Sequence, residues 1–316
     1  MSEVLILSND DDGSADLVAQ HLTETGRPPL RLDPGDFPLE SGLSATILDS
    51  GGWRTTVGGI DLDQVSAVYY RRPTVFTMPE GMSNADRDFA IGEARRAFGG
   101  LLASLPARLW INRPEHNAAA DYKPHQLHTA VAVGLTVPPT YIGNNREDAL
   151  KFAVAFGPDL IAKTFQPRLV VEHGVTRTTW ATAIRPEQLE DPAFTVTANL
   201  IQQRIEKDYE VRVTVVGARA FAVRIDAHSP AARTDFRSDY DALTYRLIDL
   251  PEDIARKLQS YMARTRLVFA AFDFAVTPGG HWVFFECNPN GQWGWLEDET
   301  GAAISQAIAE LLRSEA

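Results

Sequence analysis

Two apolar, aromatic-rich segments near the C-terminal end of the chain flank Pro278-Gly279-Gly280, a sequence typical of a β-hairpin turn. If Gly279-Gly280 forms a two-residue turn, Asp273 on the first strand lies opposite Glu286 on the second. Asn288 follows two residues after Glu286, so both side chains project from the same face of the sheet. The hairpin therefore predicts two carboxylates and an amide that converge in an otherwise apolar sheet.

This predicted cluster suits a divalent cation. Burying carboxylates costs several kcal/mol unless a cation pairs with them. Ligands that offer only oxygen favour Mg²⁺, which usually binds one or two carboxylates together with substrate phosphates. Two alternatives stay open, a solvated sheet face and an acid pair that shares one proton. Cys287 lies between two of the candidate ligands on the same strand and is expected to point away from them.

The composition excludes several classes of protein. The 316 residues suggest two or three domains, and the single cysteine excludes an internal disulfide framework and a cysteine-rich metal site. No apolar run reaches the roughly 18 residues that span a bilayer, and the N-terminus lacks a signal-peptide pattern. These features predict a cytoplasmic protein without a membrane partner. The net charge of −12 and the pI near 5.1 argue against a nucleic-acid partner, which requires a basic face.

The order of the predicted elements indicates an α/β fold. A buried strand over residues 4–7 and a helix over 14–25 form an opening typical of a doubly wound unit, although the glycine pattern of a dinucleotide site is absent. A strand over 65–70 and a helix over 84–105 complete this first region, which ends near residues 110–114. Beyond it, the chain becomes rich in strands from residue 200 onward. The predicted later helices cover 122–133, 146–156, 251–267 and 302–312, and the predicted later strands cover 160–165, 169–172, 200–205, 211–216 and 220–225.

Two lysines occupy positions that would suit phosphate groups. Lys163 lies inside an apolar strand, where its charge needs a partner or must be lost. Lys123 stands at the start of a helix, where free N–H groups and the helix dipole favour phosphates. An edge-strand lysine that reaches water and a lone surface lysine are the respective alternatives.

Charged residues also gather on other predicted strands. Glu210 and Arg212 share one face of their strand, and Arg224 lies on the next strand, so the three predict a polar site or, alternatively, a solvated face. Arg71 and Arg72 follow the strand over 65–70, at the sheet edge where α/β proteins bind ligands. Two guanidinium groups there could hold a carboxylate, and a structural arginine pair is the alternative.

The ordered set of these residues resembles the ATP-grasp family from residue 112 to the C-terminus. A narrower resemblance, to the graspetide synthetases, rests on dispersed motifs along the whole chain. These enzymes are the microviridin-type ATP-grasp maturases of ribosomal peptides. The matching motifs are Tyr70-Arg71-Arg72-Pro73, Tyr122-Lys123-Pro124-His125-Gln126-Leu127, the segment 210–217 and Asn288-Pro289-Asn290-Gly291-Gln292-Trp293.

The resemblance implies an α/β fold, α+β in its C-terminal part, in which a Rossmann-like pre-ATP-grasp domain precedes an ATP-grasp fold. The implied domains are 1–112, the pre-ATP-grasp domain, 113–199, the central or lid subdomain, and 200–316, the C-terminal subdomain with the metal site. Many ATP-grasp enzymes carry a glycine-rich phosphate loop after the second lysine. The corresponding segment here, 164–179, contains only Gly174.

The resemblance also implies roles for single residues. The cofactors would be ATP and two Mg²⁺ ions. The implied contacts with ATP are Lys123 and Lys163 with the phosphates, Lys163 also near adenine, Gln203, Arg204, Ile205 and Glu206 with adenine chiefly through their backbone, and Glu210 with the ribose. Asp273, Glu286 and Asn288 would bind Mg²⁺. Arg212 and Arg224 are the candidates that would stabilise a developing acylphosphate, and Arg71 and Arg72 those that would place acidic substrate residues.

The implied activity is ATP-dependent macrocyclisation of a ribosomal precursor peptide with a leader and an acidic core. Asp or Glu side chains would be activated as acylphosphates and joined to Ser, Thr or Lys side chains. The family also implies a homodimer. A ligase that adds a free amino acid to a peptide or small acid, and a non-catalytic ATP-binding or peptide-binding protein, are the alternative functions.

Overall fold

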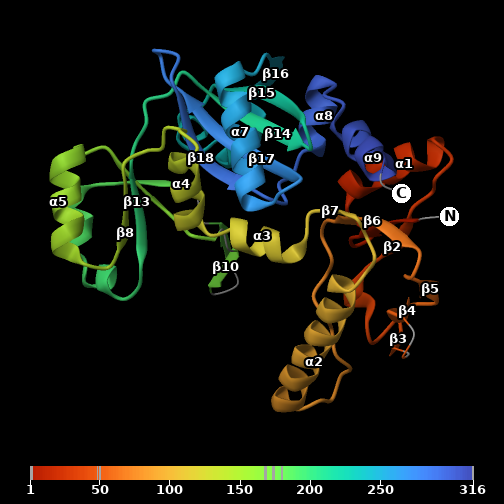
Figure 1. Ribbon diagram of the computed structural model, residues 1–316. Coiled ribbons are helices and arrows are strands. Elements are labelled where there is room, and N and C mark those ends of the chain that lie inside the picture. The colour runs from red at the N-terminus through yellow and green to blue at the C-terminus, as the bar shows by residue number, and fades with distance from the viewer. Residues whose placement is uncertain are drawn as a thin grey trace.

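The computed structural model describes residues 3–47, 49, 51–166, 169–172, 175–178 and 181–314, and its description of side chains omits residues 167–180. In the described part of the chain, no helix is both long enough and apolar enough to cross a bilayer. Three larger sheets follow one another along the chain, and helices pack on them (Figure 1).

The first sheet is parallel, in the order β2-β1-β6-β7. Alternating side chains fill two cores, because strands β1, β6 and β7 contribute side chains to a core on each face of the sheet. Leu5, Val68 and Trp110 pack against helix α2 on one face, whereas Ile6 and Tyr69 pack against helix α1 on the other. The elements are β1 (Glu3–Leu7), α1 (Gly13–Glu24), β2 (Leu30–Leu32), η1 (Pro34–Asp36), β6 (Val65–Tyr70), α2 (Asn84–Ala103) and β7 (Leu109–Ile111), with a small antiparallel sheet of β3 (Leu43–Ile47), β4 (Trp53–Val57) and β5 (Ile60–Asp61).

The second sheet is antiparallel, in the order β12-β9-β13-β8. Its elements are β8 (Thr140–Gly143), α5 (Arg146–Phe156), β9 (Leu160–Lys163), β12 (Thr182–Ile184), η2 (Pro186–Glu190), η3 (Pro192–Thr195) and β13 (Asn199–Gln203). Strands β10 (Leu169–Glu172) and β11 (Val175–Thr178) pair with each other as a separate two-stranded antiparallel sheet. The domain boundaries stay predictions. Strand β13 crosses the predicted boundary between residues 199 and 200 and is hydrogen-bonded between β8 and β9 of this sheet.

The third sheet is antiparallel, in the order β16-β15-β14-β17-β18. Its strands are β14 (Tyr209–Val216), β15 (Arg219–Ala227), β16 (Leu243–Ile248), β17 (Phe269–Val276) and β18 (Trp282–Asn288), with α6 (Pro230–Thr234), η4 (Phe236–Ser238) and η5 (Tyr240–Ala242) between β15 and β16. Helices α3 (Pro114–Ala120), α4 (Lys123–Ala132) and α7 (Glu252–Thr265) contribute to its core on one face. On that face Tyr261 of α7 packs edge-on against Phe272, with ring centroids 5.2 Å apart.

The β17–β18 hairpin departs from the predicted turn and still yields the predicted pairing. Val276 pairs with Trp282, and the Thr277 N–H donates to the His281 carbonyl at 3.0 Å, so the two-residue turn at Gly279-Gly280 is wrong. A β-bulge at Phe285 then shifts the register by one residue, and Asp273 lies opposite Glu286 as expected.

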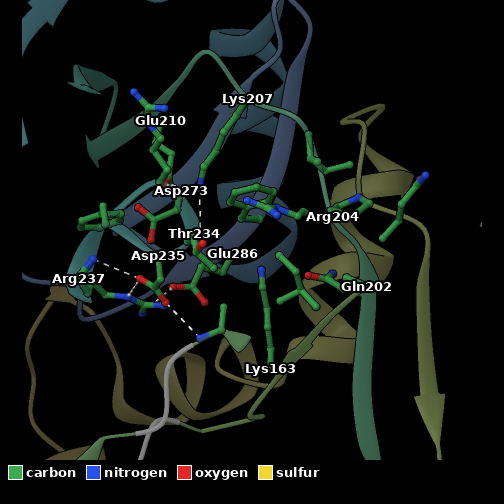
Figure 2. Close-up of a pocket in the computed structure, with 18 of the residues that line it drawn as sticks. Lys163, Gln202, Arg204, Lys207, Glu210, Thr234, Asp235, Arg237, Asp273 and Glu286 are labelled. Atoms are coloured by element: carbon green, nitrogen blue, oxygen red, sulfur yellow. Dashed lines mark hydrogen bonds and ion pairs between the residues drawn. The ribbon is translucent and has the colours of Figure 1, made fainter. Parts of the chain in front are cut away.

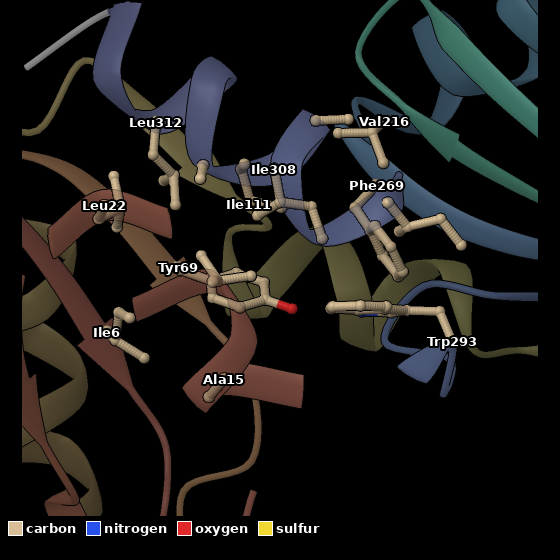
Figure 3. Close-up of a cluster of buried hydrophobic side chains, with 14 of the residues drawn as sticks. Ile6, Ala15, Leu22, Tyr69, Ile111, Val216, Phe269, Trp293, Ile308 and Leu312 are labelled. Atoms are coloured by element: carbon tan, nitrogen blue, oxygen red, sulfur yellow. The ribbon is translucent and has the colours of Figure 1, made fainter. Parts of the chain in front are cut away.

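The C-terminal helices join the third sheet to the first. Helix α9 (Ile304–Ser314) lies beside α1, with α8 (Gly294–Thr300) next to α9, so the two ends of the chain are close together (Figure 1). Ile308 and Leu312 of α9 pack into the same core as Ile6 and Tyr69, and Trp293 faces the Tyr69 hydroxyl (Figure 3). This shared core fixes the position of the first sheet relative to the third.

Candidate active site

A pocket lies between the second and third sheets and gathers most of the predicted site residues (Figure 2). Lys163 enters it from β9, Glu210 from β14, Asp273 from β17 and Glu286 from β18. The predicted residues that line it are Lys123, Lys163, Gln203, Arg204, Ile205, Glu210, Asp273 and Glu286. Residues 233–237, between β15 and β16, complete its lining.

The carboxylates of Asp273 and Glu286 face the pocket from neighbouring strands. The Asn288 side-chain amide donates to Asp273 Oδ2 at 3.2 Å and to Glu286 Oε1 at 3.3 Å, so the three predicted metal ligands come together. Arg212 Nε lies 3.7 Å from Asp273 Oδ1. The pKa of Asp273 is raised to about 7, chiefly by burial, with Arg212 opposing the rise and the negative charge of Glu286 adding to it.

Glu286 is held in its ionised form. Lys123, the first residue of α4, places its Nζ 2.6 Å from Glu286 Oε2, and Arg237 Nη1 lies 3.5 Å from Oε1. Burial alone would raise the pKa of Glu286, but the positive charges of Lys123 and Arg237 outweigh burial and hold it well below its ordinary range. The pocket therefore keeps a buried negative charge beside cationic donors.

The ligand set fits a hard divalent cation. Asp273 Oδ1 is buried and accepts no hydrogen bond from any described residue, so an acceptor points into the site without a donor. Within the described residues there is no group of three or more His, Cys, Asp and Glu side chains that could hold a metal on their own. Two carboxylates and an amide suit Mg²⁺ that shares its coordination with substrate phosphates.

Lys163 lies over an aromatic ring instead of an acid. Its Nζ is 4.6 Å from the centroid of the Phe285 ring, and the ammonium group forms no hydrogen bond with any described residue. Burial lowers the pKa of Lys163, and the attraction of Glu286 opposes that shift. Because the bulge at Phe285 breaks the strict alternation of β18, Phe285 and Glu286 both line the pocket.

The segment after β13 exposes backbone at the pocket edge. The N–H groups of Gln203 and Arg204 donate to Pro139 and Asp159 carbonyls. By contrast, the backbone groups of Ile205 and Glu206 form no backbone hydrogen bond with the described part of the chain. Glu206 is exposed and does not line this pocket, and it lines the adjacent one together with Ile205, Lys207 and Glu210.

Glu210 is buried at the pocket wall and is already paired. Lys207 Nζ lies 2.6 Å from Glu210 Oε1 and 3.4 Å from the Thr234 carbonyl. Burial raises the pKa of Glu210, and Lys207 opposes the rise. Lys207 is therefore a pocket residue that the sequence reasoning missed.

Asp235 and Arg237 were also missed. The Asp235 carboxylate, nearly fully buried, accepts two hydrogen bonds from the Arg237 guanidinium, each at 2.9 Å, and one from the Ala181 N–H at 3.3 Å (Figure 2). Burial alone would lower the pKa of Arg237, but Asp235 and Glu286 together raise it. The only available signal was an acid and an arginine two residues apart in a connecting segment, which carries no information about where that segment folds.

Arg224 does not join Arg212. It pairs with Val211, whose side chain packs in the core beneath α7, so Arg224 lies on the face of the sheet away from the pocket. There its guanidinium binds Asp226 at 2.5 Å and lies 3.7 Å from the centroid of the Tyr209 ring. The prediction that Arg224 faces the same site as Arg212 is wrong.

Arg71 does not face a substrate either. Its side chain is fully buried, and its guanidinium donates to acceptors on Asn290, Gly291 and Gln292. The alternative noted above, a structural arginine, is therefore correct for Arg71. Arg72 is exposed and stays a candidate. Gly174, the single glycine of the predicted phosphate loop, lies outside the described residues.

Comparisons with known proteins agree with this architecture. A family profile described as MvdD pre-ATP grasp domain matches residues 3–118. A solved structure of a RiPP-associated ATP-grasp ligase from Chryseobacterium gregarium, in complex with ADP and a leader and core peptide, has 30% sequence identity and a TM-score of 0.93. The match covers 100% of this chain and 98% of that chain. This chain belongs to the RiPP-associated ATP-grasp ligases.

Two further ligases of this kind match over their full length. Macrocyclase MdnC from Microcystis aeruginosa MRC, bound with precursor peptide MdnA, has 27% identity and a TM-score of 0.87, covering 99% of this chain and 100% of that one. Macrocyclase MdnB from the same organism has 29% identity and a TM-score of 0.82, covering 99% of both chains. A search of curated proteins found no match.

The comparisons confirm the resemblance to the peptide-maturing ATP-grasp enzymes and the expected α/β fold, with a pre-ATP-grasp domain before the ATP-grasp part. The protein is an ATP-dependent ligase of this family.

Proposed function

We propose that this ligase is an ATP-dependent peptide macrocyclase. It activates Asp or Glu side chains of a ribosomal precursor peptide and joins them to Ser or Thr side chains as esters, or to Lys side chains as amides. One observation carries the proposal: Lys123 and Lys163 converge with Asp273 and Glu286 in one pocket of a chain that aligns from end to end with the macrocyclases MdnB and MdnC.

In this proposal ATP occupies the pocket. Adenine lies against the backbone of Ile205, next to Glu206 at the edge of the pocket, where hydrogen-bonding groups are available, and Glu210 binds the ribose. The phosphates lie near Lys123 and Lys163, whose charges would neutralise them. A phosphate beside Lys163 would replace the missing anionic partner of a lysine whose pKa burial now lowers.

Asp273, Glu286 and Asn288 would hold Mg²⁺, with two ions as our proposal for the loaded state. A metal held by these residues would neutralise negative charge on the phosphates. Lys123 would then exchange its ion pair with Glu286 for a phosphate oxygen.

The proposed reaction has two steps. A carboxylate oxygen of the peptide attacks the γ-phosphorus, the bond to the bridging oxygen breaks, and ADP leaves an acylphosphate. A hydroxyl or amine of the same peptide then attacks the acyl carbon, loses its proton and expels inorganic phosphate. Arg212, next to Asp273 on the pocket side of the sheet, would stabilise the charge on the acylphosphate.

The substrate side of the proposal is a precursor peptide with a leader and an acidic core. Arg72 is exposed at the end of β6 and is our candidate for holding an acidic core residue. If Arg72→Ala left precursor affinity and turnover at wild-type values, this role would be removed. We also propose that the ligase is a cytoplasmic homodimer, which light scattering coupled to gel filtration would test for the oligomeric state.

Trapping the intermediate tests this function. Incubation with a precursor peptide encoded beside this gene, ATP and Mg²⁺ should release ADP only when the peptide is present. Hydroxylamine added to the reaction should convert the activated Asp or Glu side chains into hydroxamates, located by tandem mass spectrometry. Release of AMP, or ADP release that does not depend on any peptide, would argue against the proposal.

A further inference from the structure

The Arg71 guanidinium lies between the first sheet and the loop that follows β18, outside the pocket. It donates to the Asn290 carbonyl at 2.9 Å, to Asn290 Oδ1 at 3.0 Å, to the Gly291 carbonyl at 3.1 Å and to Gln292 Oε1 at 2.5 Å. The Asn290 side-chain amide donates back to the Arg71 carbonyl, and Asp12 lies 3.4 Å from Arg71 Nε. A buried cation with so many fixed acceptors specifies one position for this loop.

Gly291 brings the backbone of this loop into direct contact with the site. A Cβ atom on Gly291 would lie 2.6 Å from Ala271 Cβ and 3.1 Å from both Arg212 Nη2 and Asn288 Cβ. Gly291 is not among the glycines with positive φ, so a close approach, and not an unusual backbone conformation, requires glycine here.

Arg212 depends on this packing for its position. Its nearest acid is Asp273, at 3.7 Å from Nε, and its guanidinium forms no hydrogen bond with the described residues. Without such bonds, the side chain is held by the atoms around it, among them the bare backbone of Gly291. A shift of about 1 Å in a group that acts on the reacting atoms can cost about 100-fold in rate.

We propose that Arg71 and Gly291 are positioning residues that act through Arg212. The buried guanidinium of the first sheet fixes the loop 290–292, and the missing Cβ of Gly291 leaves the space in which Arg212 is set against Asp273. The inference rests on the proposed function only for the role of Arg212 in the reaction. The placement of the side chain can be tested without it.

A crystal structure of Gly291→Ala tests the geometry directly. We expect the Arg212 guanidinium to move away from Asp273, beyond the present 3.7 Å. An unchanged Arg212 in the folded variant would overturn the proposal, whatever reaction the protein catalyses. If wild-type protein shows no peptide-dependent ADP release, the proposed function fails, and this structural result still decides the inference.

A double-mutant cycle tests the route through Arg212. Gly291→Ala should lower kcat for peptide-dependent ADP release by about tenfold or more, with a change in the KM for ATP of less than about threefold. In an Arg212→Ala background the same change should alter kcat by less than about twofold, because the group that it displaces is gone. If the losses of kcat in the two single variants multiplied in the double variant, Gly291 would act independently of Arg212, and the proposal would be overturned.

The control variants separate positioning from stability. Gly100→Ala in α2 adds a Cβ into open space and should leave kcat unchanged. Arg71→Ala removes all of the buried contacts and can prevent folding, so Arg71→Lys, which keeps the charge, is the second variant. A folded Arg71→Lys variant should have a lower kcat than wild type, and in an Arg212→Ala background the same change should have little further effect. A wild-type kcat in the Arg71→Lys single variant would contradict the role of Arg71.

Discussion

Glu286 is the residue on which most charges of the pocket act. Lys123 and Arg237 contact its two carboxylate oxygens, and the Asn288 amide joins it to Asp273. These contacts keep Glu286 ionised despite its burial, which is the state that a metal ligand requires.

Glu286→Gln should therefore lower both ADP release and peptide conversion on the order of 100-fold, because a neutral amide neither binds Mg²⁺ as well nor balances Lys123. Initial rates at saturating ATP and Mg²⁺ measure the effect. Glu310→Gln, which changes a surface carboxylate that contacts Arg219 and Gln306, should keep wild-type rates. Wild-type turnover in Glu286→Gln would contradict the metal assignment.

Asp235 holds Arg237 in place beside Glu286. Asp235→Asn cannot maintain both hydrogen bonds to the guanidinium, so we expect kcat/KM for ATP to fall by about tenfold. Steady-state kinetics provide the measurement, and Asp241→Asn, a nearby exposed acid, is the matched control. Equal kinetics in the two variants would mean that Arg237 does not need its buried partner.

Single residues differ in how much of their role the sequence could reveal. Lys163, Glu210 and Asp273 were predictable, because charged groups in apolar strands need partners and therefore mark a site. Arg71 also stood out as a charged residue at the end of an apolar strand, but its charge serves a buried structural contact. The acceptors of its hydrogen bonds lie more than 200 residues further along the chain. No local pattern distinguishes such a buried structural contact from a contact with a substrate.

At the scale of elements, the β17–β18 hairpin shows where pattern reasoning stops. Alternation and the Pro-Gly-Gly segment predicted two paired strands, and both exist. The turn and the bulge at Phe285 were not predictable. Several turn types fit Pro-Gly-Gly, and a run of aromatic residues shows no change in its pattern where a bulge occurs. The prediction of the Asp273–Glu286 pair was correct only because the bulge compensates for the longer turn.

The packing of α7 on the third sheet carries a stability prediction. Phe272 is fully buried and lies edge-on to Tyr261 of α7. Phe272→Ala should lower the free energy of unfolding by about 3–5 kcal/mol, since it removes buried apolar surface and leaves a cavity. Urea unfolding followed by circular dichroism measures the loss. Phe89→Ala, at a side chain that is 71% exposed, should stay within about 0.5 kcal/mol of wild type.

At the scale of the whole molecule, Asn112 ties the first sheet to the third. Its side-chain amide donates to the Phe269 and Pro289 carbonyls at 2.8 Å, and its oxygen accepts from the Val268 and Phe269 N–H groups. The sequence predicted a boundary in this region, whereas only the fold shows that a boundary residue holds both parts together.

Asn112→Ala should lower the free energy of unfolding by about 3 kcal/mol or more, because it leaves buried backbone groups without partners. Thermal unfolding measures this cost, and Asn144→Ala, an exposed asparagine with one hydrogen bond to Thr195, is the control. A melting temperature of Asn112→Ala equal to that of the control would show that the joint depends on the apolar core around Trp293 instead.

The α/β fold, with a pre-ATP-grasp domain before the ATP-grasp part, was accessible from the sequence through the resemblance to a known family. The residue patterns alone indicated only α/β units and a hairpin with candidate metal ligands. No sequence pattern indicated that Arg71 and Asn112, at the edge of the first sheet, bind the loop that follows β18 beside the site. Contacts between distant segments have no local signature, so they became visible only in the folded chain.

The intact mass of the precursor peptide, after incubation with the ligase, ATP and Mg²⁺, tests macrocyclisation most directly. The proposed function predicts the loss of one water for each ester or amide formed, only when ATP is present. A mass gain that matches an added amino acid would contradict macrocyclisation and indicate ligation of a free amino acid. An unchanged mass in a peptide that nonetheless stimulates ADP release would contradict it as well.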